Sequence, residues 1–172
     1  MIILADTRQQ DAKHRQKEKW FADHGIEVRR TKLYVGDYTL PTDQSVCIDT
    51  KRDMQEIVGN LANKSEHERL AREAERAREA GIKLIYLIEN DGGEIGHTGI
   101  YNKTITDISQ VHSWKNPRLF ILRKGQQVYP RATRGVTLQK MMYTFSKHHG
   151  CEFQFCASKD SGQRIIELLT KN

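Results

Sequence analysis

Two aspartates and a lysine stand close together in a stretch that otherwise has the pattern of β-strands. Residues 35–51 read VGDYTLPTDQSVCIDTK and include Asp37, Asp49 and Lys51. Charged side chains inside strands are unfavourable unless a partner compensates them, and two neighbouring carboxylates repel each other. A cation relieves this repulsion, and oxygen ligands of this kind suit Mg²⁺ or Mn²⁺. The residue types therefore indicate a site for a divalent metal.

The spacing of these residues predicts that they meet on one face of a hairpin. Side chains two positions apart on a strand share a face, so Asp49 and Lys51 point together while Thr50 points away. A turn over residues 41–44 would bring Asp37, on the preceding strand, close to Asp49.

Lys51 adds a second kind of chemistry to the two carboxylates. A lysine beside a bound metal can orient a water molecule or stabilise charge on a phosphate. An Asp followed on the next strand by Asp-x-Lys is therefore typical of metal-assisted phosphodiester hydrolysis. The alternative is a surface hairpin with an ordinary ion pair between Lys51 and Asp49, since so short a pattern is common.

The elements that must position these residues alternate between helix and strand along the chain. The apolar run at 82–89 is the strongest strand and is expected to be central, and 90–117 reads as a long loop with one short helix near Asp107. The remaining strands are expected at 2–4, 27–33, 38–40, 46–51, 119–122 and 152–156, and the helices at 14–24, 53–62, 65–80, 137–148 and 161–169. This order predicts an α/β fold with a central mixed β-sheet flanked by helices.

Two of the helices begin at residues that favour an N-cap. Asp53 is expected to cap the helix that follows Lys51. Ser65 and Glu68 have the spacing of a capping box at the start of the next, highly charged helix.

Composition limits the class of protein. The 172 residues are 37% hydrophobic and 29% charged, which predicts a single soluble domain over residues 1–172. No apolar run is long enough to span a bilayer, and we see no secretion signal, so no membrane partner is expected. The three cysteines lack CxxC spacing, which favours reduced thiols and a cytoplasmic location. The net charge of +6 and the pI near 9.3 favour a polyanionic partner such as DNA.

Several blocks in a fixed order carry a resemblance to a known family. The blocks are ADTRQQ, VGDYTL, IDTKRDMQEIVGNL and REAERAREAGIKLIYLIE. In this order they resemble the nuclease domain of the XPF family (excision-repair cross-complementing group four), within the PD-(D/E)xK superfamily. The later blocks WKNPR and HGCEFQFCASKDSGQRIIELL extend the likeness to short, free-standing members from bacteriophages and prophages.

The resemblance implies a fold, an activity and a partner. The fold would be restriction-endonuclease-like, and the activity that of an Mg²⁺- or Mn²⁺-dependent DNA endonuclease acting on branched or structured DNA. Such enzymes typically leave a 5′-phosphate and a 3′-hydroxyl. Family members usually carry a helix-hairpin-helix module, which these 172 residues lack, so substrate choice would come from the nuclease domain itself, from a homodimer or from another protein. Nuclease domains of the family pair through their own surfaces, so the resemblance implies a homodimer. A phage or prophage origin would place the protein in the cytoplasm of a bacterial host.

The resemblance also assigns roles to particular residues. Asp37 and Asp49 fall on metal ligands, and Lys51 falls on the catalytic lysine. Asp6 falls on the first aspartate of the family pattern, near the site at the end of the first strand, and is a further candidate ligand.

The chain departs from the family pattern at three places. Thr50 stands where the family has arginine, and Gln9 where it usually has glutamate. The acidic residue that often follows the catalytic strand is represented by Gln55 or Glu56. Fewer carboxylates imply weaker metal binding, so a catalytically weak or silent scaffold that binds DNA or a partner nuclease is the alternative function.

Cationic and aromatic residues are candidates for DNA contacts, each with a plainer alternative. Arg8 could contact the scissile phosphate or pair with Asp6 or Asp37. Trp114 could stack on a base or be a buried loop anchor. The full set of candidates is Arg8, Arg69, Arg72, Arg76, Trp114, Lys115, Arg118 and Arg134.

The arginines at 69, 72 and 76 recur at helical spacing and would form one cationic stripe. Glutamates, Glu73 among them, are interleaved with the stripe, so a solvated face of ion pairs is favoured there. Glu66 or His67 could approach the metal from the start of the same helix. Near Arg134, Lys124 and Arg131 have no neighbouring carboxylate in the sequence, which favours a DNA-contact surface.

Overall fold

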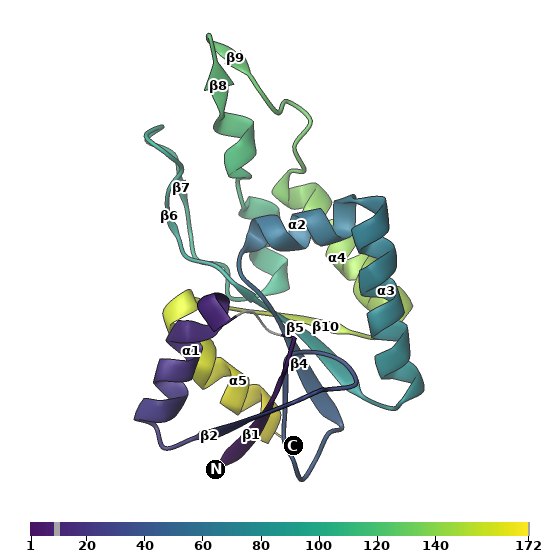
Figure 1. The fold of residues 1–172 in the computed structure, drawn as a ribbon. Helices are drawn as coiled ribbons and strands as arrows, with labels where there is room; N and C mark the ends of the chain where they lie inside the picture. Colours follow the sequence, from purple (N-terminus) through teal and green to yellow (C-terminus); the bar gives the residue numbers. More distant parts are fainter. Residues whose placement is uncertain (9–10, 172) are drawn as a thin grey trace.

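A six-stranded mixed sheet forms the centre of the molecule (Figure 1). The computed structural model describes residues 1–8 and 11–171, and for residues 11–14 it describes the backbone alone. In spatial order the strands are β10 (Glu152–Cys156), β5 (Lys83–Glu89), β4 (Val46–Lys51), β3 (Tyr38–Thr39), β1 (Ile2–Asp6) and β2 (Glu27–Thr31). The predicted α/β class and central mixed sheet are confirmed.

The strand directions bring several chain segments to one edge of the sheet. Strands β4, β5 and β10 are mutually parallel. Strand β3 is antiparallel to both β4 and β1, so β1 runs in the same direction as β4. The carboxyl ends of β1 and β4, at Asp6 and Lys51, therefore lie at the same edge. Strand β5 reads KLIYLIE and is buried from its second residue on, as expected of a parallel strand covered on both faces.

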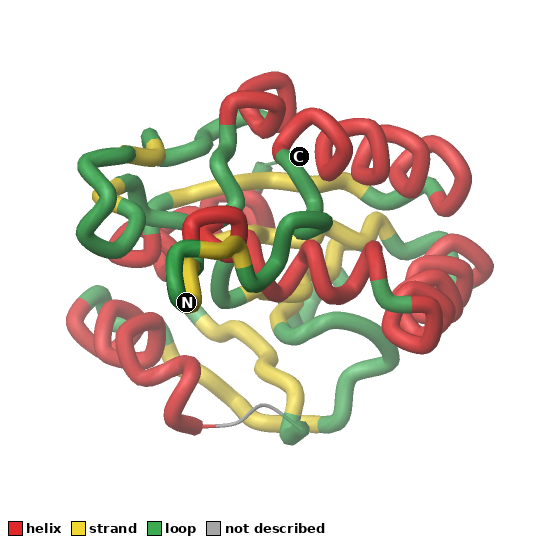
Figure 2. The backbone as a smooth tube through the Cα atoms, turned by 90° about the horizontal axis from the view of Figure 1, so that it is seen from above, coloured by secondary structure: helices red, strands yellow, loops and turns green. Residues whose placement is uncertain are grey.

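Helices cover both faces of the sheet, as Figure 2 shows from above. One face packs against α1 (Asp11–Asp23) and α5 (Ser161–Thr170). The other face packs against α2 (Met54–Ala62), α3 (Lys64–Glu79) and α4 (Gly135–His149). Among the described residues, no helix combines the length and the apolar character needed to cross a membrane.

The alternation of side chains along β4 decides which of them face the helices α2 to α4. Ile48 is buried in the core beneath α1 and α5, whereas Cys47 is buried in the core beneath α2 to α4. Asp49 and Lys51 follow Cys47 at intervals of two residues, so they face the side of the sheet that α3 covers.

Side-chain caps set the starts of the two helices after β4. Asp53 accepts a hydrogen bond of 2.8 Å from the backbone N–H of Glu56, so the predicted cap of α2 is confirmed. The predicted capping box at Ser65 is wrong, because α3 begins one residue earlier and Asn63 is its N-cap. The Asn63 side chain accepts from the N–H of Ser65 at 3.0 Å and from its hydroxyl at 2.8 Å, and asparagine caps as well as serine does.

Two small hairpins extend away from the sheet (Figure 1). The first joins β6 (Gly93–Glu94) to β7 (Tyr101–Asn102), and the second joins β8 (Leu122–Arg123) to β9 (Gln126–Gln127). Between them lie the 3₁₀ helices η1 (Ile108–Ser113) and η2 (Pro117–Phe120), and a third, η3 (Ser158–Asp160), precedes α5. The short helix predicted near Asp107 is confirmed. The strand predicted at 119–122 is wrong, because Asn116 caps and Pro117 opens a 3₁₀ turn there.

Candidate active site

A cavity of about 350 Å³ lies where β1, β4 and α3 meet. Acidic and basic side chains from segments far apart in the sequence line it together. The lining residues are Asp6, Arg8, Gly36, Asp37, Asp49, Arg69, Arg72, Glu73 and Arg76.

The C-terminal end of β4 contributes a buried ion pair. Lys51 Nζ lies 2.6 Å from Asp49 Oδ1, and the two residues are only 4% and 8% exposed. The ammonium also lies 5.3 Å from the centre of the Tyr86 ring. Burial by itself would lower the pKa of Lys51, but the charge of Asp49 and its hydrogen bond hold it above the usual value. Lys51 is therefore a protonated donor at neutral pH.

A glycine allows the chain before Asp37 to approach β4 closely. Gly36 has a φ of +71°, and a Cβ atom built on it would lie 3.1 Å from the carbonyl oxygen of Ile48. Asp37 N–H then donates to the same carbonyl at 2.7 Å. Only glycine suits both the left-handed backbone and the close contact, so Gly36 sets the position of Asp37.

Thr50 orients the Asp37 carboxylate. Its hydroxyl and its backbone N–H donate to Asp37 Oδ2 at 2.6 Å and 2.9 Å. Burial and the charge of Asp49 raise the pKa of Asp37 to about 6, although the hydrogen bonds from Thr50 act in the opposite direction. The expectation that Thr50 points away from the site is corrected: its short side chain at the end of β4 reaches the carboxylate on the neighbouring segment.

Glu73 is a third carboxylate in the cavity, and the sequence interpretation missed it by assigning it to a solvated face. Its Oε1 accepts from Gly36 N–H at 3.3 Å, while its buried Oε2 has no hydrogen-bond partner among the described residues. Burial, followed by the charge of Asp49, raises the pKa of Glu73 to about 7. A signal was present, because Glu73 lies three residues after Leu70 and four before Ala77, on the buried stripe of α3.

The carboxylate of Asp6 is occupied by donors from the protein itself. Arg8 donates to it through its backbone N–H and Nε at 2.7 Å and through Nη2 at 2.8 Å, and Leu33 N–H donates at 2.8 Å. Burial would raise the pKa of Asp6, but these hydrogen bonds hold it below the usual value. In this arrangement Asp6 holds the guanidinium of Arg8 at the rim of the cavity, which is one of the alternatives considered for Arg8.

The arginine stripe of α3 faces the cavity. Arg69, Arg72 and Arg76 all line it and are exposed, so this solvated face also borders the cavity. Arg69 Nη2 is paired with Glu66 Oε2 at 2.9 Å. The Nδ1 atom of His67 lies 3.2 Å from the Leu61 carbonyl oxygen, so neither Glu66 nor His67 approaches the three carboxylates.

The candidates for the acidic residue after the catalytic strand lie outside the cavity. Gln55 donates to the side chain of Asn116, and Glu56 accepts from Arg52 N–H at 2.9 Å. Glu73, from the next helix, supplies the third carboxylate instead. Gln9 lies outside the described residues.

The carboxylates of the cavity fit a hard divalent cation. Asp37, Asp49 and Glu73 line one cavity, Asp49 raises the pKa of both others, and Glu73 Oε2 is buried without a donor. A carboxylate oxygen left without a partner among other carboxylates suits Mg²⁺ or Mn²⁺. Among the described residues, no three acidic, histidine or cysteine side chains are already gathered around one point, so binding an ion would draw these carboxylates together.

The other candidates for DNA contact lie between η1 and the start of α4. Trp114 is only 7% exposed and packs in the core, so it is a buried loop anchor and its ring is not free to stack on a base. Lys115 Nζ donates to the Tyr101 carbonyl at 3.2 Å. Arg118 lies 5.6 Å from the centre of the Tyr129 ring, and Arg134 is exposed at the N-cap of α4.

Comparison with solved structures identifies the class of fold. One structure of XPF from Aeropyrum pernix aligns with a TM-score of 0.57 and 14% identity, over 98% of this chain and 63% of that chain. A structure of XPF from the same organism in complex with DNA aligns with a TM-score of 0.58 and 15% identity, over 98% and 62% of the two chains. The fold is that of an XPF nuclease domain, and the chain spans less than two thirds of either structure.

The family follows from the sequence itself. The chain belongs to the ERCC4 domain family, whose model matches residues 5–169. Members of this family are usually structure-specific DNA endonucleases and typically use a divalent metal. A search of curated proteins found no match. These comparisons give no support to a phage or prophage origin or to a homodimer, and both stay predictions from the resemblance.

Proposed function

We propose that this protein is an Mg²⁺- or Mn²⁺-dependent endonuclease that cuts branched or otherwise structured DNA. The observation that carries the proposal is the cavity lined by Asp37, Asp49 and Glu73, in which Glu73 Oε2 is buried without a donor, next to the buried, protonated Lys51. Family membership supports the same reaction class.

The three carboxylates would hold the cation. When bound, such a cation polarises a phosphate oxygen and lowers the pKa of water. Thr50 keeps Asp37 oriented, and Gly36 N–H does the same for Glu73. We do not count Asp6 among the ligands of the proposed site, because its oxygens already accept from Arg8 and Leu33. Its role is to position Arg8.

Lys51 would stabilise the transition state as a cation. Its ammonium is held by Asp49 at 2.6 Å, so it can donate to an attacking water or to a phosphate oxygen without first having to be ordered. Because the charge of Asp49 holds its pKa above the usual value, we assign Lys51 the role of a donor rather than of a general base.

The arginines at the rim would bind the DNA backbone. Arg8, Arg72 and Arg76 line the same cavity as the carboxylates, so a phosphate drawn in by them arrives beside the cation site. Backbone contacts of this kind fix the position of DNA without reading its sequence. The expected products carry a 5′-phosphate and a 3′-hydroxyl, as in the family that the sequence resembles.

A catalytically silent DNA-binding scaffold is the second candidate. Two observations favour it: the Asp6 carboxylate already accepts hydrogen bonds from Arg8, and Thr50 stands where the family pattern has arginine. The retention of Asp37 and Asp49 in one cavity, with Lys51 paired to Asp49, favours the enzyme.

Cleavage assays decide between the two. Labelled flap, fork, Holliday-junction and plain duplex DNA are incubated with Mg²⁺ or Mn²⁺ and with wild type, Asp49→Ala or Lys51→Ala protein. The enzyme is supported by cutting of branched DNA that both substitutions abolish. Binding of these DNAs by the wild type without any cutting, with either metal, would establish the scaffold. The predicted homodimer is tested on the same samples by sedimentation.

A further inference from the structure

The positive charge of the chain is concentrated in one segment. Residues 108–151 contain eight Lys and Arg and no Asp or Glu. The rest of the chain contains the other 20 Lys and Arg against all 22 Asp and Glu, so it is slightly acidic. The net charge of +6 therefore arises entirely from residues 108–151, which lie outside the β4 hairpin and α3.

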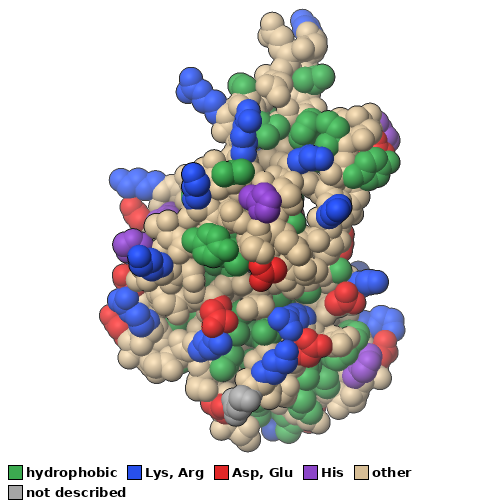
Figure 3. All heavy atoms as spheres, turned by 180° about the vertical axis from the view of Figure 1, so that it is seen from behind, with side chains coloured by type: hydrophobic (Ala, Val, Ile, Leu, Met, Phe, Trp, Pro, Cys, Tyr) green, Lys and Arg blue, Asp and Glu red, His purple; other side chains and the backbone are tan. Residues whose placement is uncertain are grey.

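Within this segment, residues 116–134 form an extension that we call the arm. It consists of η2, the β8–β9 hairpin and the return to α4, and it stands out from the body in Figure 1. Lys124 and Gly125 form the turn, with φ angles of +51° and +77°, as in the tight turns that connect two strands. Every residue from 121 to 130 is exposed. In Figure 3, the charged side chains on the protruding part of this face are mainly blue cationic ones, with green apolar side chains among them, and most red acidic ones lie below it.

The arm also exposes large apolar side chains. Ile121, Leu122, Val128 and Tyr129 are between 40% and 62% exposed. Arg118 lies over the Tyr129 ring. Apolar side chains that are exposed to water contribute little to the stability of a small hairpin. A concentration of them among cations is typical of a surface that binds a partner.

The buried side chain of Asn116 connects both ends of the arm to α2, the helix that follows β4. Asn116 is 1% exposed. Its Oδ1 accepts from the Gln55 side chain in α2 and from Arg118 N–H at 3.0 Å, while its Nδ2 donates to the Thr133 carbonyl at 2.8 Å. Gln55 is four residues beyond Lys51, so the arm has a defined position relative to the site.

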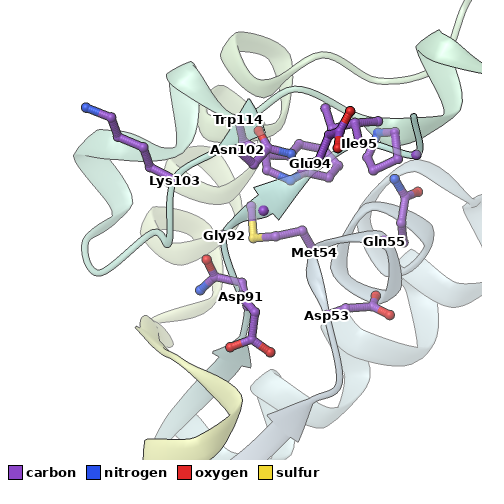
Figure 4. A pocket seen from close by; sticks show the side chains of 14 residues that line it. Asp53, Met54, Gln55, Asp91, Gly92, Glu94, Ile95, Asn102, Lys103 and Trp114 are labelled. Carbon is purple, nitrogen blue, oxygen red and sulfur yellow. The ribbon is translucent and has the colours of Figure 1, made fainter. Parts of the chain in front are cut away.

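The other hairpin is tied to the same base. Asn102 of β7 exchanges two hydrogen bonds with the backbone of Lys115, of 2.8 Å and 2.9 Å. A pocket of about 320 Å³ lies at this base, and Figure 4 shows Asp53 and Gln55 at the start of α2 on one side of it and Asp91 on the other. The base of the arm is thus built into the body of the protein rather than joined by a free linker.

We propose that the arm is a branch-recognition element that binds DNA independently of the catalytic cavity. Its cations, Arg123, Lys124 and Arg131 among them, contact phosphates of a duplex that flanks the branch. The side chains of Ile121 and Leu122 pack against base faces that are unstacked at the branch point. The inference rests on the proposed function, since it names the part of the substrate that this element reads.

The chemistry of the arm favours branched DNA over other partners. Phosphates complement a surface that carries only positive charge, whereas a second copy of the arm would bring like charges together. A continuous duplex offers phosphates but no exposed base faces, and apolar side chains contact DNA where bases are separated. A branch point offers both.

The test is metal-free binding, so that cleavage plays no part. Fluorescence anisotropy measures the affinity of full-length protein for a labelled fork and for a duplex of equal length, over a range of salt concentrations. The charge variant is Arg123→Gln with Lys124→Asn, since asparagine tolerates the left-handed turn. The apolar variant is Ile121→Ser with Leu122→Ser. The matched control removes two exposed cations elsewhere, Lys19→Gln with Lys83→Gln.

The charge variant is expected to bind both DNAs about tenfold more weakly and to reduce the salt slope by about two. The apolar variant is expected to lose about fivefold for the fork and less than twofold for the duplex, because only the fork offers separated bases against which apolar side chains can pack. The control is expected to change either affinity by less than twofold. Unchanged melting temperatures show that the variants are folded.

Three results would overturn the proposal. The charge variant could bind like the control, the apolar variant could weaken fork and duplex equally, or the apolar variant could change the oligomeric state in sedimentation, which would make the arm an interface between copies. The proposed function fails differently: wild type would then bind forks through the arm and cut none of them with Mg²⁺ or Mn²⁺.

Discussion

The cavity of the candidate active site and the arm differ in how their charges are arranged. At the cavity, carboxylates lie beside cations, and two of the buried carboxylates touch a charge of opposite sign: Asp49 touches Lys51 at 2.6 Å and Asp6 touches Arg8 at 2.7 Å. In the arm, the charges have one sign and lie in water. A buried charge needs a partner because removal from water is unfavourable, whereas exposed like charges are screened within about 10 Å at ordinary salt.

This difference matches two different tasks. Chemistry at a phosphate requires charges whose positions are fixed before the substrate arrives, and mutual pairing in a buried cavity achieves that. Holding a long polyanion requires many weak contacts that tolerate movement, and exposed cations provide them. Asn116 joins the arm to α2 through Gln55, which fixes the position of the arm relative to the cavity. The following predictions test whether the two regions are separable.

The largest effect is expected from Asp49→Asn. Cleavage should fall by about 10³-fold or more, since a metal ligand and the partner of Lys51 are lost together. Unfolding free energy should fall by about 3 kcal/mol, because Lys51 is left buried without its counter-charge. Single-turnover cleavage and urea denaturation measure the two effects. Fork binding without metal should stay within twofold of wild type, and a parallel loss of binding would show that the cavity and the arm are one site.

Glu73→Gln is expected to slow cleavage by about 10–100-fold by weakening metal binding. Without metal, the same change should stabilise the protein at pH 8 by about 1–3 kcal/mol. The sign follows from the pKa of Glu73, which is raised to about 7 in the folded state: the folded protein binds the proton more tightly than the unfolded chain, so the wild type loses stability as pH rises from about 4.5 to 7.

The control for Glu73 is Glu79→Gln in the exposed last turn of the same helix. Thermal melts with and without Mn²⁺ distinguish the two positions. Mn²⁺ should raise the melting temperature of wild type and of the control, and should raise that of Glu73→Gln much less. Equal metal stabilisation in all three proteins would remove Glu73 from the proposed metal site.

Gly36→Ala is expected to reduce cleavage about tenfold and to destabilise the protein by about 1–3 kcal/mol, since it strains a positive φ and presses a methyl group against the Ile48 carbonyl. Gly25→Ala separates these two causes. Gly25 has a φ of +67° but open space around its Cβ position, so it should lose stability and keep its cleavage rate. Equal cleavage rates for the two variants would mean that Gly36 does not position Asp37.

The smallest effect is expected from Asn116→Ala, which detaches the base of the arm from α2. Cleavage of a fork at limiting enzyme should fall about fivefold, and cleavage at saturating enzyme should change less than twofold, because the cavity itself is untouched. The hydrogen bonds lost, including that to Thr133, should lower stability by about 1–3 kcal/mol. A fall at saturating enzyme would show that the arm contributes to the chemical step.

Much of the local structure could be predicted because it depends on neighbours in the sequence. Strand alternation predicted that Asp49 and Lys51 share a face, the cap at Asp53 followed from its residue type, and the order of elements predicted the mixed sheet. The two wrong predictions, the cap at Ser65 and the strand at 119–122, arose where neighbouring residues favour different local structures. Asn63 and Ser65 are equally good caps, and the apolar run 119–122 is interrupted by the turn that Asn116 and Pro117 favour.

The sequence by itself determined the class of the fold, the two carboxylates and lysine of β4 and its hairpin, and the concentration of cations in residues 108–151. Only the tertiary structure decided which other groups join them. Glu73 lines the cavity because α3 packs over β4 with its buried stripe facing the sheet. The Thr50 hydroxyl donates to Asp37 on the neighbouring segment, and the Asp6 carboxylate accepts from Arg8. The physical reason is that backbone periodicity specifies the direction of a side chain along its own element, whereas the distance between elements is set by the packing of the whole core.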